Sequence, residues 1–421
     1  MNSGETAVEL TADDRAWLNG EHGEGAVFAM RLVVTMAEVA RAPRLRDITS
    51  AHIDSCLYHG QAGLDFAERL LDGGATVSVP ATLNVSSLDL LHPELVRLDD
   101  DTRDRAKRLM DAYVRMGCRP TWTCAPYQLP ERPVFGEHVA WAESNAIVFA
   151  NSVLGARTNR YGDFIDICAA ITGRVPDAGL HTDEGRRATL LLRLRGIPEA
   201  LLDHDLPYPV LGHLLGLRAG NVVVAVEGLP PDTSEDRLKA VGAAAASSGG
   251  VSLFHAIGVT PESSTWDVVA GNGAREEVVT LGDLRAARDQ LAHVPSGAEI
   301  GAVSVGTPHA SDRELRRLAD LVADDRPSIP FYVNTGRAQL AGIGSIADDL
   351  VDAGVTVVTD TCTYITPVMH DLAGPVMTDS GKWAWYAPSN LGYEVAIGSL
   401  EECVRSAAVG RVVRDETIWG S

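Results

Sequence analysis

The stretch Ile300-Gly-Ala-Val-Ser-Val305, with Ser311 to Ala323 and Pro330 to Val333 after it, decides the fold class. The two short apolar runs predict buried strands, and the segment between them predicts an amphipathic helix capped by Ser311. The alternation continues with a helix over 346–353, a strand over 355–359, a strand over 393–397 and a helix over 400–408. Strands and helices that alternate at this spacing predict a parallel sheet with crossover helices.

The rest of the chain continues this α/β pattern in two further parts. Near the N-terminus we expect helices over 26–40, 64–71 and 103–116, and strands over 75–80 and 118–122. In the middle we expect strands over 190–194, 222–226 and 252–257 and a helix over 234–247. Because 421 residues exceed one ordinary core, we predict three α/β regions, residues 1–195, 196–290 and 291–421.

Composition and charge limit the kinds of partner that the protein can bind and the cell compartment in which we expect it. A net charge of −21 repels phosphate backbones, so we expect no nucleic-acid binding, and an anionic substrate would need a local basic pocket. Met1–Leu10 has no apolar signal core, and no apolar run approaches the roughly 18 residues of a membrane span. The six cysteines are scattered without a CxxC pair. We therefore expect a cytoplasmic protein with reduced thiols and no membrane contact.

Several loop-like segments are rich in small and polar residues, which is where binding groups usually lie. They are residues 79–84, 123–127, 140–145, 150–160, 306–311, 359–364 and 377–386. No P-loop, GxGxxG, HExxH or GxSxG motif occurs, which argues against nucleotide-dependent enzymes, zinc proteases and serine hydrolases.

The segments supply candidate site residues, each with a plain structural alternative. Arg157 and Arg160 predict a carboxylate clamp, because guanidinium groups bind carboxylates bidentately, but solvated loop arginines would give the same pattern. Lys382 is one of three lysines and lies in an apolar stretch beside Ser380; it would hold a carboxylate or lose its charge by burial. Both would also suit a solvated turn.

Other candidates come from the remaining segments. Thr82 and Asn84 would orient a ligand, or belong to an ordinary turn. Cys124 would serve metal or thiolate chemistry, or be a buried inert thiol. Cys362 follows a predicted parallel strand, where ligand crevices form. His309 would act as an acid or base, or be a surface histidine.

Taken in order, these segments resemble the large subunit of aconitase X. The shared features are Val-Pro-Ala-Thr-Leu-Asn at 79–84, Cys-Ala-Pro-Tyr at 124–127, Ala-Trp-Ala-Glu-Ser at 140–144, Ala-Asn-Ser-Val-Leu-Gly-Ala-Arg-Thr-Asn-Arg at 150–160, Asp-Thr-Cys at 360–362 and Thr-Asp-Ser-Gly-Lys at 378–382. The resemblance covers about residues 17–408, and the run at 151–160 is its most specific element.

The resemblance implies an aconitase-like fold of several α/β domains with mainly parallel sheets around a central cleft. It also implies a hydro-lyase that dehydrates a small hydroxy-acid, either cis-3-hydroxy-L-proline or mevalonate 5-phosphate in this family. The stretch from His52 to Gly60 is closer to the hydroxyproline type. The family further implies a separate small swivelling subunit that completes the site and supplies a serine base.

One departure concerns the cofactor. The family resemblance implies an iron–sulfur cluster held by three cysteines, and two of these map onto Cys124 and Cys362. The third lies in a Gly-Cys-Pro-His motif, which here is Gly306-Thr307-Pro308-His309. Thr307 is a poor cluster ligand, because thiolates hold such clusters. The expected cofactor is therefore an altered cluster, a mononuclear metal or none.

The expected reaction removes a proton next to a carboxylate and expels a β-hydroxyl. Lys382 and the two arginines would hold the carboxylate, Thr82, Asn84 and Asn151 would orient it, and His309 would serve as the acid if the metal is absent. Two alternatives stay open. One is a diverged lyase, isomerase or cyclase of specialised metabolism without a standard cluster, and the other is a non-catalytic subunit that binds a ligand or partner.

Overall fold

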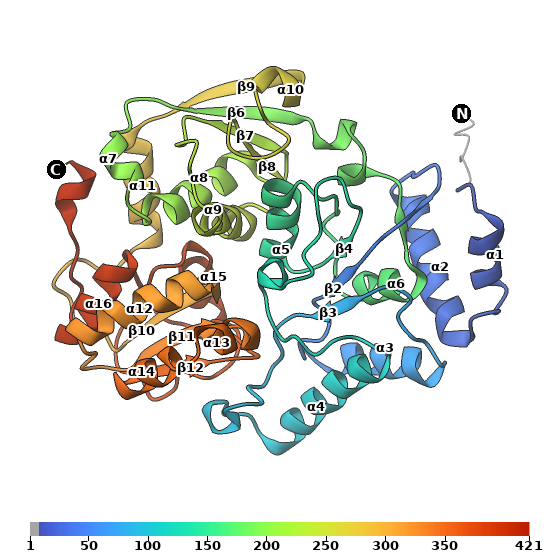
Figure 1. Ribbon diagram of the computed structural model, residues 1–421, viewed down its shortest axis with the longest axis horizontal. Helices are drawn as coiled ribbons and strands as arrows, with labels where there is room; N and C mark the ends of the chain where they lie inside the picture. The colour runs from blue at the N-terminus through green and yellow to red at the C-terminus, as the bar shows by residue number, and fades with distance from the viewer. Residues whose placement is uncertain (1–7, 421) are drawn as a thin grey trace.

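The structure is a computed structural model that describes residues 8–420, so the expectation about Met1–Leu10 lies mostly outside the described residues. Three parallel sheets follow one another along this part of the chain, each with its own helices. Figure 1 shows them as three groups that surround the short helix α5 (Ser144–Phe149). Mainly parallel sheets with crossover helices confirm the predicted α/β class.

The first region combines a parallel sheet with a small antiparallel pair. The sheet has the order β3-β2-β4 (Ala81–Leu83, Ala51–Ile53, Ala140–Trp141), and β1 (Leu45–Asp47) pairs with β5 (Arg174–Pro176). The other helices of the region are α1 (Ala12–Leu18), α2 (Glu24–Val39), α3 (Gln61–Asp72), α4 (Asp100–Arg115) and α6 (Ile165–Thr172). Thr11 caps α1 through a capping box with Asp14, which is why this helix begins where it does.

The second region is a four-stranded parallel sheet of order β8-β7-β6-β9. Its strands are β6 (Ala188–Leu194), β7 (Val224–Glu227), β8 (Phe254–Ala256) and β9 (Ala270–Val279), and its helices are α7 (Glu199–Leu202), α8 (Pro207–Ala219), α9 (Glu235–Ser248), α10 (Trp266–Val269) and α11 (Leu281–Leu291). Since β6 pairs with β7 and β9, this sheet begins before the predicted boundary at residue 195.

The third region is a five-stranded parallel sheet of order β12-β11-β10-β13-β14. Its strands are β10 (Ala302–Ala310), β11 (Phe331–Thr335), β12 (Val355–Val358), β13 (Val376–Thr378) and β14 (Val395–Ile397), and its helices are α12 (Asp312–Asp324), α13 (Arg337–Ile343), α14 (Ile346–Asp352), α15 (Gly381–Leu391) and α16 (Leu400–Val409). Ser311 caps α12 as predicted, because its hydroxyl accepts from the Glu314 amide at 3.2 Å.

Short helical turns complete the described chain. They are η1 (Pro93–Leu95), η2 (Pro126–Gln128), η3 (Ala150–Leu154), η4 (Gly179–His181), η5 (Glu184–Arg186) and η6 (Glu416–Trp419). None of the helices within residues 8–420 is long and apolar enough to cross a membrane.

Two predicted strands near the N-terminus are wrong. Residues 75–80 form no strand, because Val77 and Ser78 donate their amides to loop and helix carbonyls at Met116 and Ala170 rather than to a neighbouring strand. Residues 118–122 contribute only an isolated bridge between Arg119 and Thr82. Residues 377–386, expected to be loop-like, are instead the end of β13 and the start of α15.

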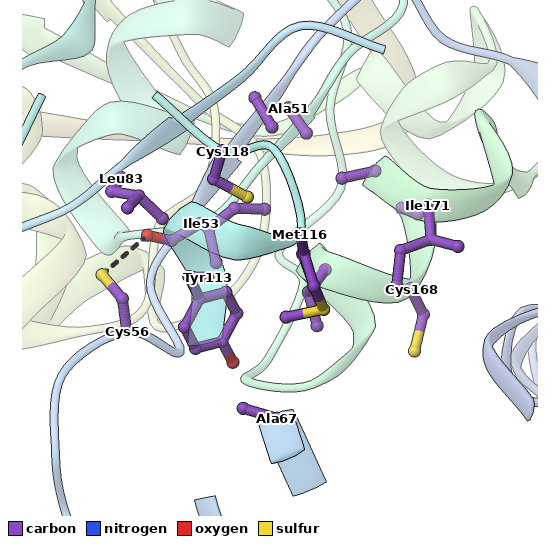
Figure 2. Packing of buried hydrophobic residues seen from close by; sticks show 14 of the residues in the cluster. Ala51, Ile53, Cys56, Ala67, Leu83, Tyr113, Met116, Cys118, Cys168 and Ile171 are labelled. Atoms are coloured by element: carbon purple, nitrogen blue, oxygen red, sulfur yellow. Dashed lines mark hydrogen bonds between the residues drawn. The ribbon is translucent and has the colours of Figure 1, made fainter. Parts of the chain in front are cut away.

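The first region has a core that supports the loop after β2. Figure 2 shows Cys56, Cys118 and Cys168 packed with Tyr113, Met116 and Ile171, and all of these are fully or almost fully buried. The Cys56 thiol donates to the Ile53 carbonyl at 3.4 Å, and Tyr113 donates its hydroxyl to Ser55 at 2.7 Å. These three cysteines are therefore packing residues, and the hydrogen bonds of Cys56 and Tyr113 hold residues 53–56.

Helix α9 joins the three regions, since it contacts α5 of the first region, α8 of its own region and α15 of the third. Close approach here requires small residues. A Cβ atom on Gly381 would lie 2.9 Å from the Ala244 Cβ and 3.0 Å from the Pro209 carbonyl oxygen. Gly381 therefore lets the first turn of α15 press against α8 and α9, which fixes the position of the next residue, Lys382.

Candidate active site

Three polar side chains follow the three neighbouring strands of the first sheet. Asp54 comes directly after β2, Asn84 directly after β3, and Glu143 shortly after β4. Because these strands are parallel, their carboxyl ends meet at one edge, which is where ligand sites form in such sheets. All three residues line one cavity of about 380 Å³.

The cavity lies between the first and third regions. The first region contributes Asp54, Leu57, His59, Asn84, Val85, Glu143, Ser144, Ile147, Arg160, Tyr161, Gly162 and Asp163, and the third contributes Tyr364, Ile365, Lys382, Tyr386 and Asn390. A ligand here would contact both regions at once.

Glu143 and Lys382 form a buried ion pair across this boundary. Glu143 has a left-handed backbone (φ 69°), a strained conformation for a residue other than glycine. The same carboxylate caps α5 by accepting from the amides of Asn145 at 3.0 Å and Ala146 at 2.9 Å. Burial alone would lower the pKa of Lys382, but the Glu143 carboxylate and Tyr364 raise it well above its ordinary value. Lys382 therefore keeps its positive charge inside the cavity.

Asp54 and Asn84 form a second polar pair, in which the Asn84 amide nitrogen donates to the Asp54 carboxyl. Asp166 holds the backbone at Asp54, because its carboxylate accepts from the Asp54 amide at 2.8 Å and from the Ser55 amide at 3.0 Å. Burial, with the nearby Glu143 and Asp163 carboxylates, raises the pKa of Asp54 to about 8.

The two arginines of the predicted carboxylate clamp lie apart in the structure. Arg160 lines the cavity, and no carboxylate within residues 8–420 forms an ion pair with it. Arg157 lies outside this cavity, donates to Asp183 at 2.5 Å and also bonds the His181 carbonyl. Arg160 is therefore the arginine available to a ligand, and the assignment of Arg157 to substrate binding is corrected to a loop-fixing ion pair.

Thr82 and Asn151, predicted to orient the substrate, are likewise absent from the cavity lining. The Thr82 hydroxyl bonds the His52 ring nitrogen at 2.8 Å. The Asn151 amide group donates to the carbonyls of Thr158 and Ser252 and accepts from Arg186. Every polar atom of the Asn151 side chain is thus used to hold the loop, so its role is structural.

Behind Lys382 lies a group of buried side chains from the predicted cofactor motifs. The Cys362 thiol is 3.4 Å from the Thr307 hydroxyl, and the Cys124 sulfur accepts from the His309 amide at 3.3 Å. Cys124 is close enough to Cys362 and Lys382 for their charges to affect its pKa, which burial raises. The structure thus brings these two cysteines together with Thr307 and Lys382.

His309 and Ser380 are held by hydrogen bonds in this group. His309 is fully buried, with one ring nitrogen 3.1 Å from the Thr123 hydroxyl and the other 3.3 Å from the Thr361 carbonyl. Burial lowers the pKa of His309 to about 4, so the ring is neutral. The Ser380 hydroxyl donates to the Thr307 carbonyl and caps α15. These contacts tie both residues to the surroundings of Thr307 and Lys382, and neither lines the cavity between the first and third regions, so the acid role of His309 has no support in the geometry of that cavity.

The donor set does not fit a cluster held by three thiolates. Its third position carries the Thr307 hydroxyl, which already contacts the Cys362 thiol. The described residues contain no group of three or more His, Cys, Asp and Glu side chains arranged to hold a metal ion. Alcohols are not deprotonated as thiols are on binding iron, so two cysteines remain where three are needed.

Restoring the third thiol is therefore expected to create a cluster site. Anaerobic reconstitution with iron and sulfide should load Thr307→Cys but not the wild-type chain, because only the variant offers three thiolates. Iron and sulfide analysis with visible absorption measures this, and Thr361→Cys, a buried threonine nearby, is the control. Equal loading of wild type and Thr307→Cys would contradict the prediction.

Comparison with known proteins gives the family. Family models for the first, second and third domains of aconitase X match residues 7–184, 188–289 and 300–409. The chain belongs to the aconitase X family. The crystal structure of aconitase X from Thermococcus kodakaraensis in its holo form superposes with a TM-score of 0.85 at 31% identity, covering 95% of this chain and 100% of that one.

Two kinds of aconitase X relative are similar over most of the chain. The cis-3-hydroxy-L-proline dehydratase of Pseudomonas aeruginosa is 43% identical over 422 residues, which is 97% of this chain and 72% of the relative. That of Hypocrea jecorina is 41% identical over 415 residues, 96% of this chain and 69% of the relative. The phosphomevalonate dehydratase large subunit of Methanothermobacter thermautotrophicus is 36% identical over 412 residues, 94% of this chain and 98% of that subunit.

Sequence reasoning missed Asp54, Glu143 and Tyr364, which line the cavity. Glu143 and Tyr364 lie in segments that were singled out for their polar residues, and Asp54 lies in the stretch from His52 to Gly60, but none of the three was chosen. The available signal was position, because Glu143 directly follows the apolar run 139–142 and a strand end faces the ligand side of a parallel sheet.

Proposed function

We propose that this protein is the large subunit of a hydro-lyase that removes water from a small hydroxylated imino acid of the cis-3-hydroxy-L-proline type. The observation that carries the proposal is one cavity that Arg160 and the buried Lys382 line together with Asp54 and Asn84. The relatives named cis-3-hydroxy-L-proline dehydratase support the same substrate class.

Arg160 and Lys382 would bind the substrate carboxylate. When the neighbouring carbon loses its proton, negative charge spreads onto this carboxylate, and the two cations stabilise that charge, the buried Lys382 ammonium more strongly because water is excluded around it. Glu143 keeps the Lys382 ammonium in one position, since the carboxylate is itself fixed by the amides of α5. The Lys382 ammonium is thus in place before the reaction begins.

The departing hydroxyl needs a proton. Tyr364 lines the cavity, and burial raises the pKa of Tyr364 well above its ordinary value, so it carries a phenolic proton at neutral pH. In the proposed reaction the α-proton goes to a base, the electron pair forms the new double bond, and the β-hydroxyl takes the Tyr364 proton and leaves as water. The phenolate then recovers a proton from solvent.

We assign the base to a separate small swivelling subunit that closes the cavity from outside. Relatives named as large subunits support such a partner, and they match this chain over 98% or 99% of their length. We also place the protein in the cytoplasm, because all six cysteines are free and buried.

The decisive experiment mixes the purified chain with its small subunit and supplies cis-3-hydroxy-L-proline and mevalonate 5-phosphate in parallel. We expect only cis-3-hydroxy-L-proline to lose water, and mass spectrometry of the product measures this loss. Turnover of mevalonate 5-phosphate alone, or of neither by a folded complex, would refute the proposed substrate class.

A second candidate is a diverged lyase, isomerase or cyclase on the same scaffold. Thr307 favours it, because a hydroxyl stands at the position that the resemblance assigns to the third cluster cysteine. Conversion of an imino acid without a mass loss of water would favour this candidate over dehydration.

A further inference from the structure

One buried polar atom in the cavity has no partner. Asn84 is 2% exposed and lines the cavity, and its side-chain oxygen makes no hydrogen bond within the described part of the chain. Leaving a buried acceptor unpaired is unfavourable, so an unpaired acceptor that lines a cavity indicates a partner from outside the chain. The amide nitrogen of the same group is engaged by Asp54. The free Asn84 oxygen therefore calls for a hydrogen-bond donor from a ligand.

The groups around the Asn84 oxygen favour a donor that carries a positive charge. Asp54 is bonded to the same amide group, and Asp163 also lines the cavity and lies close enough to Asp54 to affect its pKa. The cations Arg160 and Lys382 line the cavity too, so it offers both signs of charge. Acceptors of this kind favour an ammonium group, which has several N–H donors and a positive charge.

We propose that Asp54 and the Asn84 oxygen form a subsite for the secondary ammonium nitrogen of the substrate, while Arg160 and Lys382 take its carboxylate. The inference rests on the proposed function and narrows it, because it selects a zwitterionic imino acid over a phosphorylated hydroxy-acid. A phosphate ester has no N–H donor, and it would place negative charge beside Asp54 and Asp163.

The electrostatics of the cavity agree with this assignment. The carboxylates of Glu143, Asp163 and Asp166 raise the pKa of Asp54, and the hydrogen bond that Asn84 donates lowers it. The other titratable or charged side chains that line the cavity are those of Lys382, Arg160, His59, Tyr161 and Tyr364. Burial and the three carboxylates raise the pKa of Asp54 to about 8, so without a ligand it is mostly protonated at pH 7. A bound ammonium would reverse that effect and release the proton.

The test compares two ligands that differ at one atom. L-Proline carries the ring ammonium, whereas (S)-tetrahydrofuran-2-carboxylate has the same ring size and carboxylate with an oxygen in its place. Isothermal titration of the full chain should show L-proline binding roughly 10- to 100-fold more tightly, as expected for charge-assisted hydrogen bonds. At pH 7, titration in two buffers of different ionisation enthalpy should show proton release with L-proline and none with the ether.

Variants assign this preference to residues. Asp54→Asn and Asn84→Ala should each remove most of the preference for L-proline. Arg160→Met is the matched control, since it should weaken both ligands alike and leave their ratio unchanged. If wild type binds the two ligands equally, or if both variants keep the full preference and the proton release, the subsite assignment is wrong.

The two proposals fail differently. Turnover of cis-3-hydroxy-L-proline together with unchanged ligand preference in Asp54→Asn and Asn84→Ala would overturn the subsite and leave the hydro-lyase proposal standing. If these variants lose the preference for L-proline but the wild-type complex dehydrates no imino acid, the subsite is supported and the hydro-lyase proposal is overturned.

Discussion

Replacing Lys382 with methionine is expected to lower kcat/KM on the imino-acid substrate by about 10²- to 10³-fold. The variant removes a fixed cation from a cavity where charge develops on the substrate carboxylate, and single preorganised donors of this kind contribute about 10²–10³ in rate. It also leaves Glu143 as a buried, unpaired carboxylate, and breaking a buried pair costs roughly 3–5 kcal/mol of stability.

A double variant separates these two effects. Glu143→Gln in the Lys382→Met background removes the lone charge, so the melting temperature should recover while turnover stays low. Lys239→Met is the matched control, because Lys239 is also buried and paired with a carboxylate, Glu314, but does not line the cavity. Turnover of Lys382→Met within tenfold of wild type would contradict the assigned role of the ammonium.

Arg160→Met is expected to reduce kcat/KM by about 10²-fold, whereas Arg157→Met should leave it almost unchanged. The two arginines are three residues apart in the sequence, yet only Arg160 lines the cavity, and Arg157 is bound to Asp183. A hydrogen bond to a charged group contributes roughly 1.5–3 kcal/mol, which corresponds to this loss.

Steady-state kinetics of both variants with their melting temperatures checks this second prediction. Arg157→Met should lose at most a small amount of stability, since exposed ion pairs contribute about 0–1 kcal/mol. Equal losses of activity in the two variants would mean that the whole loop, rather than one guanidinium group, governs binding.

The parts of the fold that were predictable are those with local causes. The helices α9, α12 and α16 begin after capping residues, where hydrogen bonds form within a few positions of the sequence. Whether an apolar run becomes a strand depends on pairing with segments far away in the sequence. Residues 75–80 were predicted to be a strand, but no neighbouring strand pairs with them. Helix α15 was missed because Gly381, several aromatic residues and Pro388 oppose helix formation locally, while packing on α8 and α9 stabilises it.

The site was predictable to a similar extent. Lys382, Arg160, Asn84, Cys124 and Cys362 lie in or directly behind the cavity, because polar segments after strands gather at one edge of a sheet. Arg157 and Asn151 belong to the same polar run as Arg160, and a sequence does not show which side chains of a loop turn inward. That choice depends on partners such as Asp183 and Arg186, which lie elsewhere in the chain.

The ion pair of Glu143 and Lys382 joins the first and third regions, which also meet through hydrogen bonds of Asp89 with Thr359 and of Thr123 with His309. An occupied cavity would add further contacts between them, from Asp54 and Asn84 on one side to Lys382 on the other. Bound substrate should therefore stabilise both regions together, so that the melting temperature in calorimetry rises with substrate concentration. Loosening either half would weaken ligand binding without touching a single contact residue.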